Sequence, residues 1–199
     1  MVLINGKIFT AENKYYENGY IRITGERISE IGDMKNYISD LNDKEIDFSN
    51  KFIMPGIIDS HCHLGMWEDS VGFESDDGNE DTDPITPHLR ACDGVKLFDK
   101  CFSEAMESGV TTVFTGPGSS NPAAGLFAAF NTGGKKENMM LKEPICLKIA
   151  LGENPKSTYH TKNLAPVTRM ATISLLREMF YKAKRYLEEI GRASCRERV

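Results

Sequence analysis

The sequence predicts an α/β protein that begins with a small β unit, and three patterns along its 199 residues support this. Residues 1–50 mostly alternate apolar and polar positions between turn signals, which is typical of half-buried antiparallel strands. Residues 52–58 are apolar on both faces, and strand-like and helix-like segments then follow one another up to residue 189. This order is typical of a βα barrel or of a doubly wound sheet.

The first fifty residues predict four short strands, at 2–5, 7–10, 19–24 and 27–31. Asn5-Gly6 and Thr24-Gly25 lie between alternating runs, as hairpin turns do, because glycine adopts positive φ without strain. We therefore expect a small β domain over residues 1–50.

The rest of the chain predicts alternating strands and helices over residues 51–189. A β-branched run at 110–115 predicts a strand, and Gly109 before it is a natural stop for a helix. The expected strands are 52–58, 110–115 and 144–151, and the expected helices are 97–108 and 168–189. The apolar stripe of the last helix is expected to face inward, at Met170, Ile173, Leu176, Met179, Phe180, Ala183 and Leu187.

Residues 190–199, IGRASCRERV, lack apolar periodicity. Back-translated from Glu189 onward, they resemble read-through into a common DNA sequencing adapter. We interpret them as an adapter-derived, non-native tail, and the alternative is a natural arginine-rich tail.

Composition excludes some classes of function. A net charge of −5 and the lack of basic runs interleaved with aromatic residues argue against nucleic acid as a partner. The start, MVLINGKIFT, turns polar quickly, and no segment stays apolar for the roughly 18 residues of a membrane span. Five cysteines without a CxxC pair favour reduced thiols. We expect a cytoplasmic protein with a small-molecule substrate and no membrane partner.

Two histidines follow the apolar run one residue apart. Side chains in a strand alternate faces, so His61 and His63 project the same way and can reach one metal ion. Asp59 shares that face, where a carboxylate could orient a ligating imidazole. The alternative is a pair of hydrogen-bonded histidines at a strand end.

The string that contains them resembles the metal-ligand motif of the amidohydrolase superfamily, PGxxDxHxH, at Pro55, Gly56, Asp59, His61 and His63. The resemblance extends over roughly residues 1–189, through segments 19–32, 109–118 and 152–156, and is strongest to the imidazolonepropionase branch.

The resemblance implies a TIM-like (β/α)8 barrel, preceded by the N-terminal half of a composite β-sandwich at residues 1–50. His61 and His63 would end the first barrel strand. A barrel takes about 250 residues, so residues 51–189 would be an incomplete one. The fragment is expected to be inactive, because the family's later histidines and catalytic aspartate have no positions in it. Whether the full-length parent is a homo-oligomer stays open.

The implied chemistry is hydrolysis of a C–N bond in an amide or cyclic amide by metal-activated water. The resemblance implies one or two divalent metals, Zn²⁺ first, with Mn²⁺ or Fe²⁺ as alternatives. A deacetylase or deaminase of the same superfamily, or a non-catalytic metal-binding protein, remains an alternative.

Lys148 is the candidate for the carboxylated lysine that bridges metals in the family. In residues 145–151 the large apolar residues share one face, so Lys148 would point into the barrel with Cys146 and Ala150. Burial would favour the neutral amine, which can take up CO2. The alternatives are a lysine at a strand end that reaches solvent or a carboxylate, and Glu153 as the metal ligand.

Other polar segments give weaker evidence of a functional site. His88 and His160 fall in loops and are expected at the surface. The acidic stretch at 67–83 would lie over the site, where it would shape substrate choice or form a solvated loop. Residues 116–122 lack the Lys-Ser/Thr of a phosphate-binding loop and are expected to form a turn.

Overall fold

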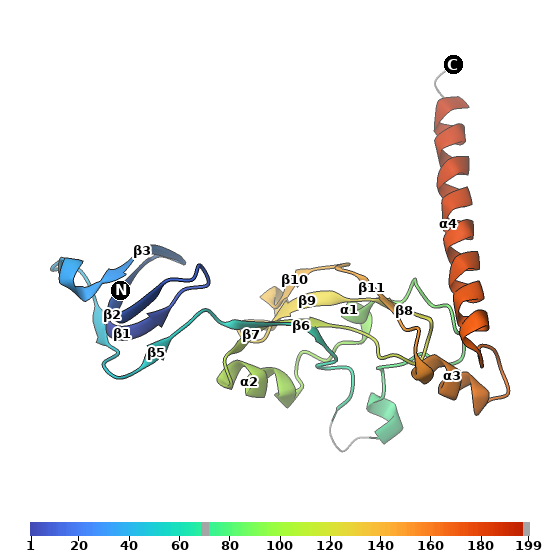
Figure 1. The fold of residues 1–199 in the computed structure, drawn as a ribbon, viewed down its shortest axis with the longest axis horizontal. Coiled ribbons are helices and arrows are strands. Elements are labelled where there is room, and N and C mark those ends of the chain that lie inside the picture. The colour runs from blue at the N-terminus through green and yellow to red at the C-terminus, as the bar shows by residue number, and fades with distance from the viewer. Residues whose placement is uncertain (69–71, 197–199) are drawn as a thin grey trace. The chain divides into compact units, whose positions relative to one another are not determined.

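The computed structural model describes residues 1–68 and 72–196, with side chains up to residue 190. The chain divides between Gly56 and Ile57 into two compact units (Figure 1). The division falls after the boundary expected at residue 50, because residues 52 and 53 pair with the first strand of the chain.

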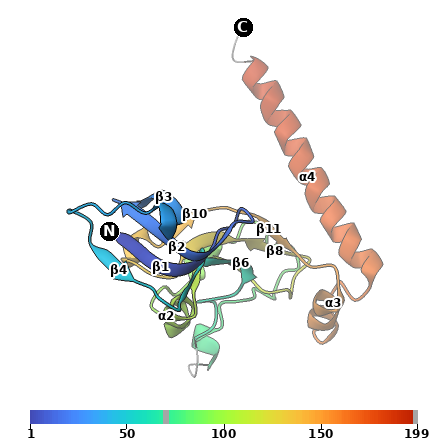
Figure 2. The ribbon, with the colours of Figure 1, turned by 60° about the vertical axis from the view of Figure 1, so that its left-hand side comes forward.

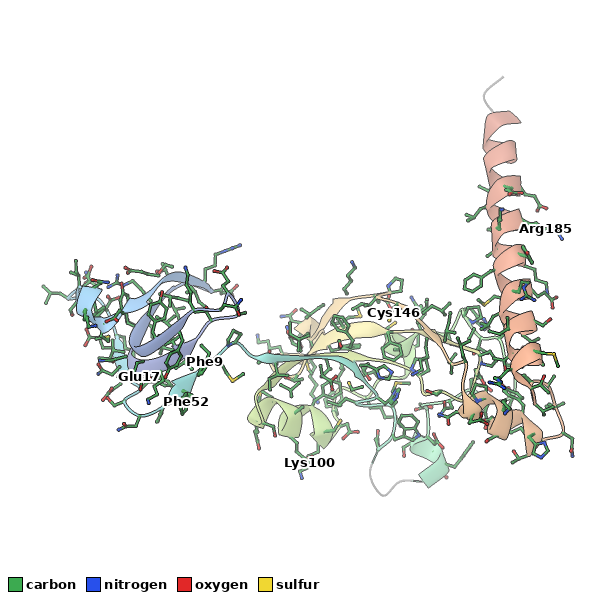
Figure 3. The ribbon with its side chains drawn as sticks, viewed as in Figure 1. Phe9, Glu17, Phe52, Lys100, Cys146 and Arg185 are labelled. Carbon is green, nitrogen blue, oxygen red and sulfur yellow. The ribbon has the colours of Figure 1, made fainter. Side chains whose placement is uncertain are left out.

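The first unit contains one mixed five-stranded sheet. Its strands are β1 (Val2–Phe9), β2 (Tyr15–Thr24), β3 (Arg27–Asp33), β4 (Glu45–Asp47) and β5 (Phe52–Ile53), with a short 3-10 turn at Met34–Asn36. The order is β3-β2-β1-β4, and β5 also pairs with β1. The β1–β2 and β2–β3 pairs are antiparallel, whereas β4 and β5 run parallel to β1. The aromatic rings of Phe9 and Phe52, labelled in Figure 3, lie 6.2 Å apart across β1 and β5.

One of the two expected hairpin turns is confirmed and the other is wrong. Gly25 has φ of 61° and closes the turn between β2 and β3. Asn5-Gly6 lies inside β1, where Asn5 has φ of 61° and the pairing with β2 shifts register. Asparagine tolerates the left-handed conformation, so the pair forms an irregularity in one long strand instead of a turn between two.

The second unit is built around two small sheets. The larger has the order β10-β9-β7-β6, and the smaller pairs β11 with β8. Their bounds are β6 (Ile57–Cys62), β7 (Val110–Thr115), β8 (Ala123–Leu126), β9 (Ala128–Asn131), β10 (Met140–Lys142) and β11 (Leu147–Ile149). The expected parallel pairing is present between β6 and β7, but β9 runs antiparallel to β7. The described strands form these open sheets and not a closed barrel.

The strand expected at 52–58 is interrupted. Residues 54–56 have no strand conformation, so β5 belongs to the first unit and β6 to the second. Proline has no backbone N–H to donate to a sheet, and Pro55 stands at this break. Ile57 and Ile58, which belong to the run that is apolar on both faces, are 46% and 61% exposed.

Helices of the second unit are α1 (Ala91–Gly94), α2 (Lys100–Glu107), α3 (Glu153–His160) and α4 (Arg169–Arg196), and 3-10 turns lie at Gly72–Ser75 and Lys136–Asn138. Helix α2 begins where Asp99 accepts a hydrogen bond from the Cys101 backbone N–H, and Gly109 follows its end with φ of 88°, as expected. Phe102 of α2 is buried against Val113 and Phe130 in the core of this unit.

Helix α4 differs from its expectation in two ways. Leu176 is buried, as expected. Four other large residues of the predicted inward stripe are exposed: Met170, Ile173, Phe180 and Leu187. Arg185 stands out from the helix in Figure 3. The helix continues to Arg196 without a break (Figure 2), so its backbone includes much of the segment interpreted as a tail. Residues 197–199 of that segment lie outside the described residues. Over the described part of the chain, no helix is long and apolar enough to cross a bilayer.

Candidate metal and substrate site

The two histidines of the motif stand at the carboxyl end of β6. His61 is the last residue but one of the strand, and His63 lies just beyond the strand. Their ring centroids are 5.3 Å apart with the planes at 76°. The strand therefore brings both imidazoles to one place, as their spacing predicts.

The orientation of His63 is set by a backbone carbonyl. Its Nδ1 lies 2.8 Å from the carbonyl oxygen of Gly116, which follows β7. A carbonyl can only accept, so Nδ1 carries a proton, and in the neutral imidazole the lone pair is then on Nε2. Asp59, expected to orient an imidazole, instead accepts a hydrogen bond from the backbone N–H of His61 at 3.1 Å.

Lys148 reaches the same place from a strand far along the sequence. It lies in β11, and its Nζ is 2.9 Å from Nε2 of His61. Burial lowers the pKa of the Lys148 amine below its ordinary value. Burial also lowers the pKa of His61, and the neighbouring Lys148 and His63 act in the same direction. Both shifts favour neutral nitrogen atoms, which are the forms that carry a lone pair.

Phe127 lies beneath all three side chains and was not predicted from the sequence. Its ring stacks on His61 with centroids 5.6 Å apart and planes at 17°, and it meets His63 at 6.2 Å. The Lys148 Nζ is 5.9 Å from the centre of the same ring. Phe127 is only 2% exposed, so it supplies a rigid apolar floor that excludes water from one side of the site.

Gly116 permits this packing. A Cβ at that position would lie 2.3 Å from Cδ2 of Phe127. Only a residue without a side chain can offer its carbonyl to His63 while the phenyl ring lies against its α-carbon. The turn expected over 116–122 therefore has a direct part in placing His63.

The remaining candidates are elsewhere. Glu153 begins α3, is paired with Lys156 at 2.9 Å, and has a side chain 77% exposed. His88 and His160 are exposed, as expected, but His160 is the last residue of helix α3 and does not lie in a loop. Across the described residues, no cluster of three or more His, Cys, Asp and Glu side chains could hold a metal ion.

Known proteins that are similar to this chain are amidohydrolases. No family model matches the chain. It is 31% identical over 149 residues to the amidohydrolase tasK of Hapsidospora irregularis. A solved amidohydrolase from Thermotoga maritima superposes on 94% of the chain with a TM-score of 0.87 and 34% identity. The chain is of the amidohydrolase type.

This amidohydrolase-type chain covers a limited part of each relative. The matched region is 69% of the chain but 15% of the Hapsidospora protein, and the chain spans 48% of the Thermotoga structure. The comparisons therefore establish what kind of protein the chain is, and its chemistry has to be inferred from its own residues.

The donor set of the amidohydrolase-type site fits a divalent cation. His61 and His63 present imidazoles that are close together, and the Nδ1 of His63 is already occupied by Gly116. The contact between Lys148 and His61 joins two nitrogen bases, each of which can act as a donor to a metal. Two imidazoles and one lysine amine are thus the residues of this chain that could hold or surround a metal.

The acidic stretch after His63 makes many of its contacts within itself and with nearby lysines. Several of its carboxylates have defined partners: Glu68 and Asp77 with Lys96, Asp76 with Trp67, Glu80 with Thr82, and Asp81 with Lys162. Asp76, Asp77 and Glu80 line a separate cavity of about 300 Å³. The described part of this loop contributes two neutral residues, Trp67 and Asn79, to the surroundings of His63.

Proposed function

We propose that this chain carries the histidine pair of a metal-dependent amidohydrolase, which cleaves a C–N bond of an amide or cyclic amide. The observation that carries the proposal is the convergence of His61, His63 and Lys148 over Phe127, with Lys148 Nζ 2.9 Å from His61 Nε2. Lys148 and His61 are 87 positions apart, so the fold of the second unit and not local sequence brings them together.

Each residue has a defined task in the proposal. The Nε2 atoms of His61 and His63 would hold the cation, and the Gly116 carbonyl holds the proton of the neutral His63 ring on Nδ1, which leaves Nε2 for the metal. A bound Zn²⁺, or Mn²⁺ or Fe²⁺ in its place, would lower the pKa of water toward about 7 and polarise the substrate carbonyl.

Lys148 is proposed as the carboxylated lysine. Its amine, with a pKa lowered by burial, is suited to lose a proton and attack CO2. The new N–C bond gives a carbamate, one proton leaves to solvent, and the product carries a negative charge on two oxygen atoms. Those oxygens would supply the anionic ligand that the two neutral imidazoles lack.

The metal proposal is tested by metal content. The full chain and a double variant, His61→Ala with His63→Ala, are purified with Zn²⁺ and analysed by inductively coupled plasma mass spectrometry. We expect bound zinc in the wild type and its loss in the double variant. His88→Ala, an exposed histidine, is the control and should retain the wild-type content. Equal zinc in the double variant and the wild type would refute the assignment.

Carboxylation is tested separately with ¹³C-labelled bicarbonate. We expect a protein-bound carbamate signal in the nuclear magnetic resonance spectrum that disappears in Lys148→Met. Lys156→Met, which removes a lysine of α3, should leave it unchanged. Zinc binding without a carbamate signal would remove Lys148 as a ligand and leave the histidines.

Products decide the reaction class. Hydrolysis of an amide releases a carboxylate and an amine, whereas deamination releases ammonia and a carbonyl. Assays of the full chain with both substrate types separate the amidohydrolase from the deaminase, and acetylated amines test for a deacetylase. The chain alone is expected to be inactive as a fragment, so the deciding assay uses the full-length parent. Bound metal with no turnover of any of these substrates by the parent would support a metal-binding protein instead.

A further inference from the structure

A cavity of about 400 Å³ is lined by His63, and its other lining residues have no part in the metal chemistry proposed above. Three segments form it: the loop after β6 with Trp67 and Asn79, the loop after β7 with Ser120, and helix α3 with Asn154 and Thr158. No Asp, Glu, Lys or Arg side chain is among the described residues that line it. We call this cavity the neutral pocket.

Trp67 forms a fixed wall of the neutral pocket. Its indole Nε1 donates a hydrogen bond to Asp76 Oδ1 at 2.5 Å, and its ring meets His63 edge-on at 5.5 Å. Gly78 lies against the indole, because a Cβ there would be 1.8 Å from Cζ2 of Trp67. An aromatic ring held on two sides in this way offers a flat surface for a planar group.

Asn79 is held so that its amide can be used for recognition. Its Oδ1 accepts a hydrogen bond from the backbone N–H of Ser120 at 3.2 Å. The backbone N–H of Gly118 donates to the carbonyl of Gly78 at 2.7 Å, which ties the two loops together beside it. Within the described residues, Asn79 Nδ2 donates to no protein atom, so its N–H groups are available to an acceptor on a ligand.

We propose that the neutral pocket binds the uncharged amide portion of the substrate, with a planar group on Trp67 and an acceptor facing Asn79. The proposal rests on the function proposed above and adds the substrate class. A charged group placed in the pocket away from His63 would lose water without gaining an opposite charge from the other lining side chains. An uncharged amide would find donors and acceptors on asparagine, serine and threonine, and polar groups of this kind fix orientation in small-molecule sites.

Trp67 also makes the test direct, because it is the one tryptophan of the chain. Its fluorescence is followed while the full chain is titrated with three probes of similar size: N-acetylalaninamide (neutral), N-acetylalanine (anionic) and alaninamide (cationic). We expect the neutral probe to bind about tenfold more tightly than either charged probe. Equal or tighter binding of a charged probe, or no fluorescence change with any of the three, overturns the proposal.

A charge substitution gives the second measurement. Asn79→Asp keeps the size of the side chain and adds a negative charge, so it should weaken the neutral probe and raise the affinity for alaninamide about tenfold. Asn138→Asp, at an exposed asparagine, is the control and should leave all three affinities unchanged. An Asn79→Asp chain with the wild-type order of affinities overturns the assignment of Asn79.

The two proposals can fail independently. Repeating the titration after metal removal by a chelator separates them. Selective binding of the neutral probe by a chain that takes up no zinc when it is purified with zinc would refute the metal site and support the pocket. Hydrolysis by a zinc-loaded chain that prefers the charged probes would support the metal site and refute the pocket.

Discussion

Replacing Tyr159 with Phe removes one oxygen atom from a buried network that joins helix α3 to two loops of the second unit. Tyr159 is fully buried, and its hydroxyl donates to Asn121 Oδ1 at 2.6 Å. Asn121 is 1% exposed, and its Nδ2 donates to the Glu80 carbonyl and to Thr86 Oγ1. Burial raises the pKa of Tyr159, so the hydroxyl stays protonated and remains a donor.

The expected loss of stability follows from what the variant leaves behind. Phenylalanine fills nearly the same space, so cavity formation contributes little. The Asn121 carbonyl oxygen, however, stays buried without its donor, and an unpaired buried acceptor costs about 1–3 kcal/mol. A loss of about 2 kcal/mol corresponds to a fall of roughly 4–8 °C in the unfolding midpoint for a chain of this size.

Urea unfolding followed by Trp67 fluorescence reports on the second unit, where Tyr159 and Trp67 both lie. Tyr181→Phe is the matched control, because Tyr181 is 61% exposed on α4 and should change stability by less than about 0.5 kcal/mol. A double-mutant cycle with Asn121→Ala should give a coupling energy of about 1 kcal/mol. If Tyr159→Phe were no more destabilising than the control, the network would not contribute as described.

Two further predictions concern strain and reactivity in the same unit. Gly65→Ala should destabilise the chain by more than about 2 kcal/mol, since Gly65 has φ of 75° and a Cβ there would lie 2.9 Å from Phe102. The control Gly109→Ala adds backbone strain without a clash and should cost about 1–2 kcal/mol. Equal losses of stability in thermal unfolding would contradict the contact between Gly65 and Phe102. Burial raises the pKa of the Cys101 thiol to about 11. Iodoacetamide at pH 8 should therefore alkylate the exposed Cys146 about 100-fold faster than Cys101, as measured by peptide mass spectrometry. Comparable rates for the two thiols would contradict the burial of Cys101.

The sequence predicted where the paired histidines lie better than it predicted the residues that pack against them. A period of two placed His61 and His63 together, and the structure brings their rings within 5.3 Å. The same alternation turned Lys148 toward the site, although its role as a ligand stays a prediction. These inferences succeed because side-chain direction in a strand depends on local geometry alone.

Phe127 and the antiparallel strands around it were not predicted for a physical reason. Residues 123–130 consist mainly of alanine and glycine with two phenylalanines and a leucine, so they show neither period two nor period 3.6. Strands β8 and β9 form there because small residues let neighbouring backbones approach closely, and that depends on residues distant in sequence. The same limit applies to Asn5-Gly6, whose local signal for a turn is overridden by pairing with β4 and β5.

The parallel pairing of β1 with β4 and β5 has a mechanical consequence for the first unit. β1 opens the unit and β5 lies near its end, so a load between Met1 and Gly56 pulls these strands in opposite directions along their axes. Their hydrogen bonds lie across that direction and must rupture together. Handles at Met1 and Thr24 would instead unzip the antiparallel β1–β2 pair from its end, one bond after another. Single-molecule stretching should therefore give a higher rupture force for the first pair of handles, and equal forces would show that shear resistance does not govern the sheet.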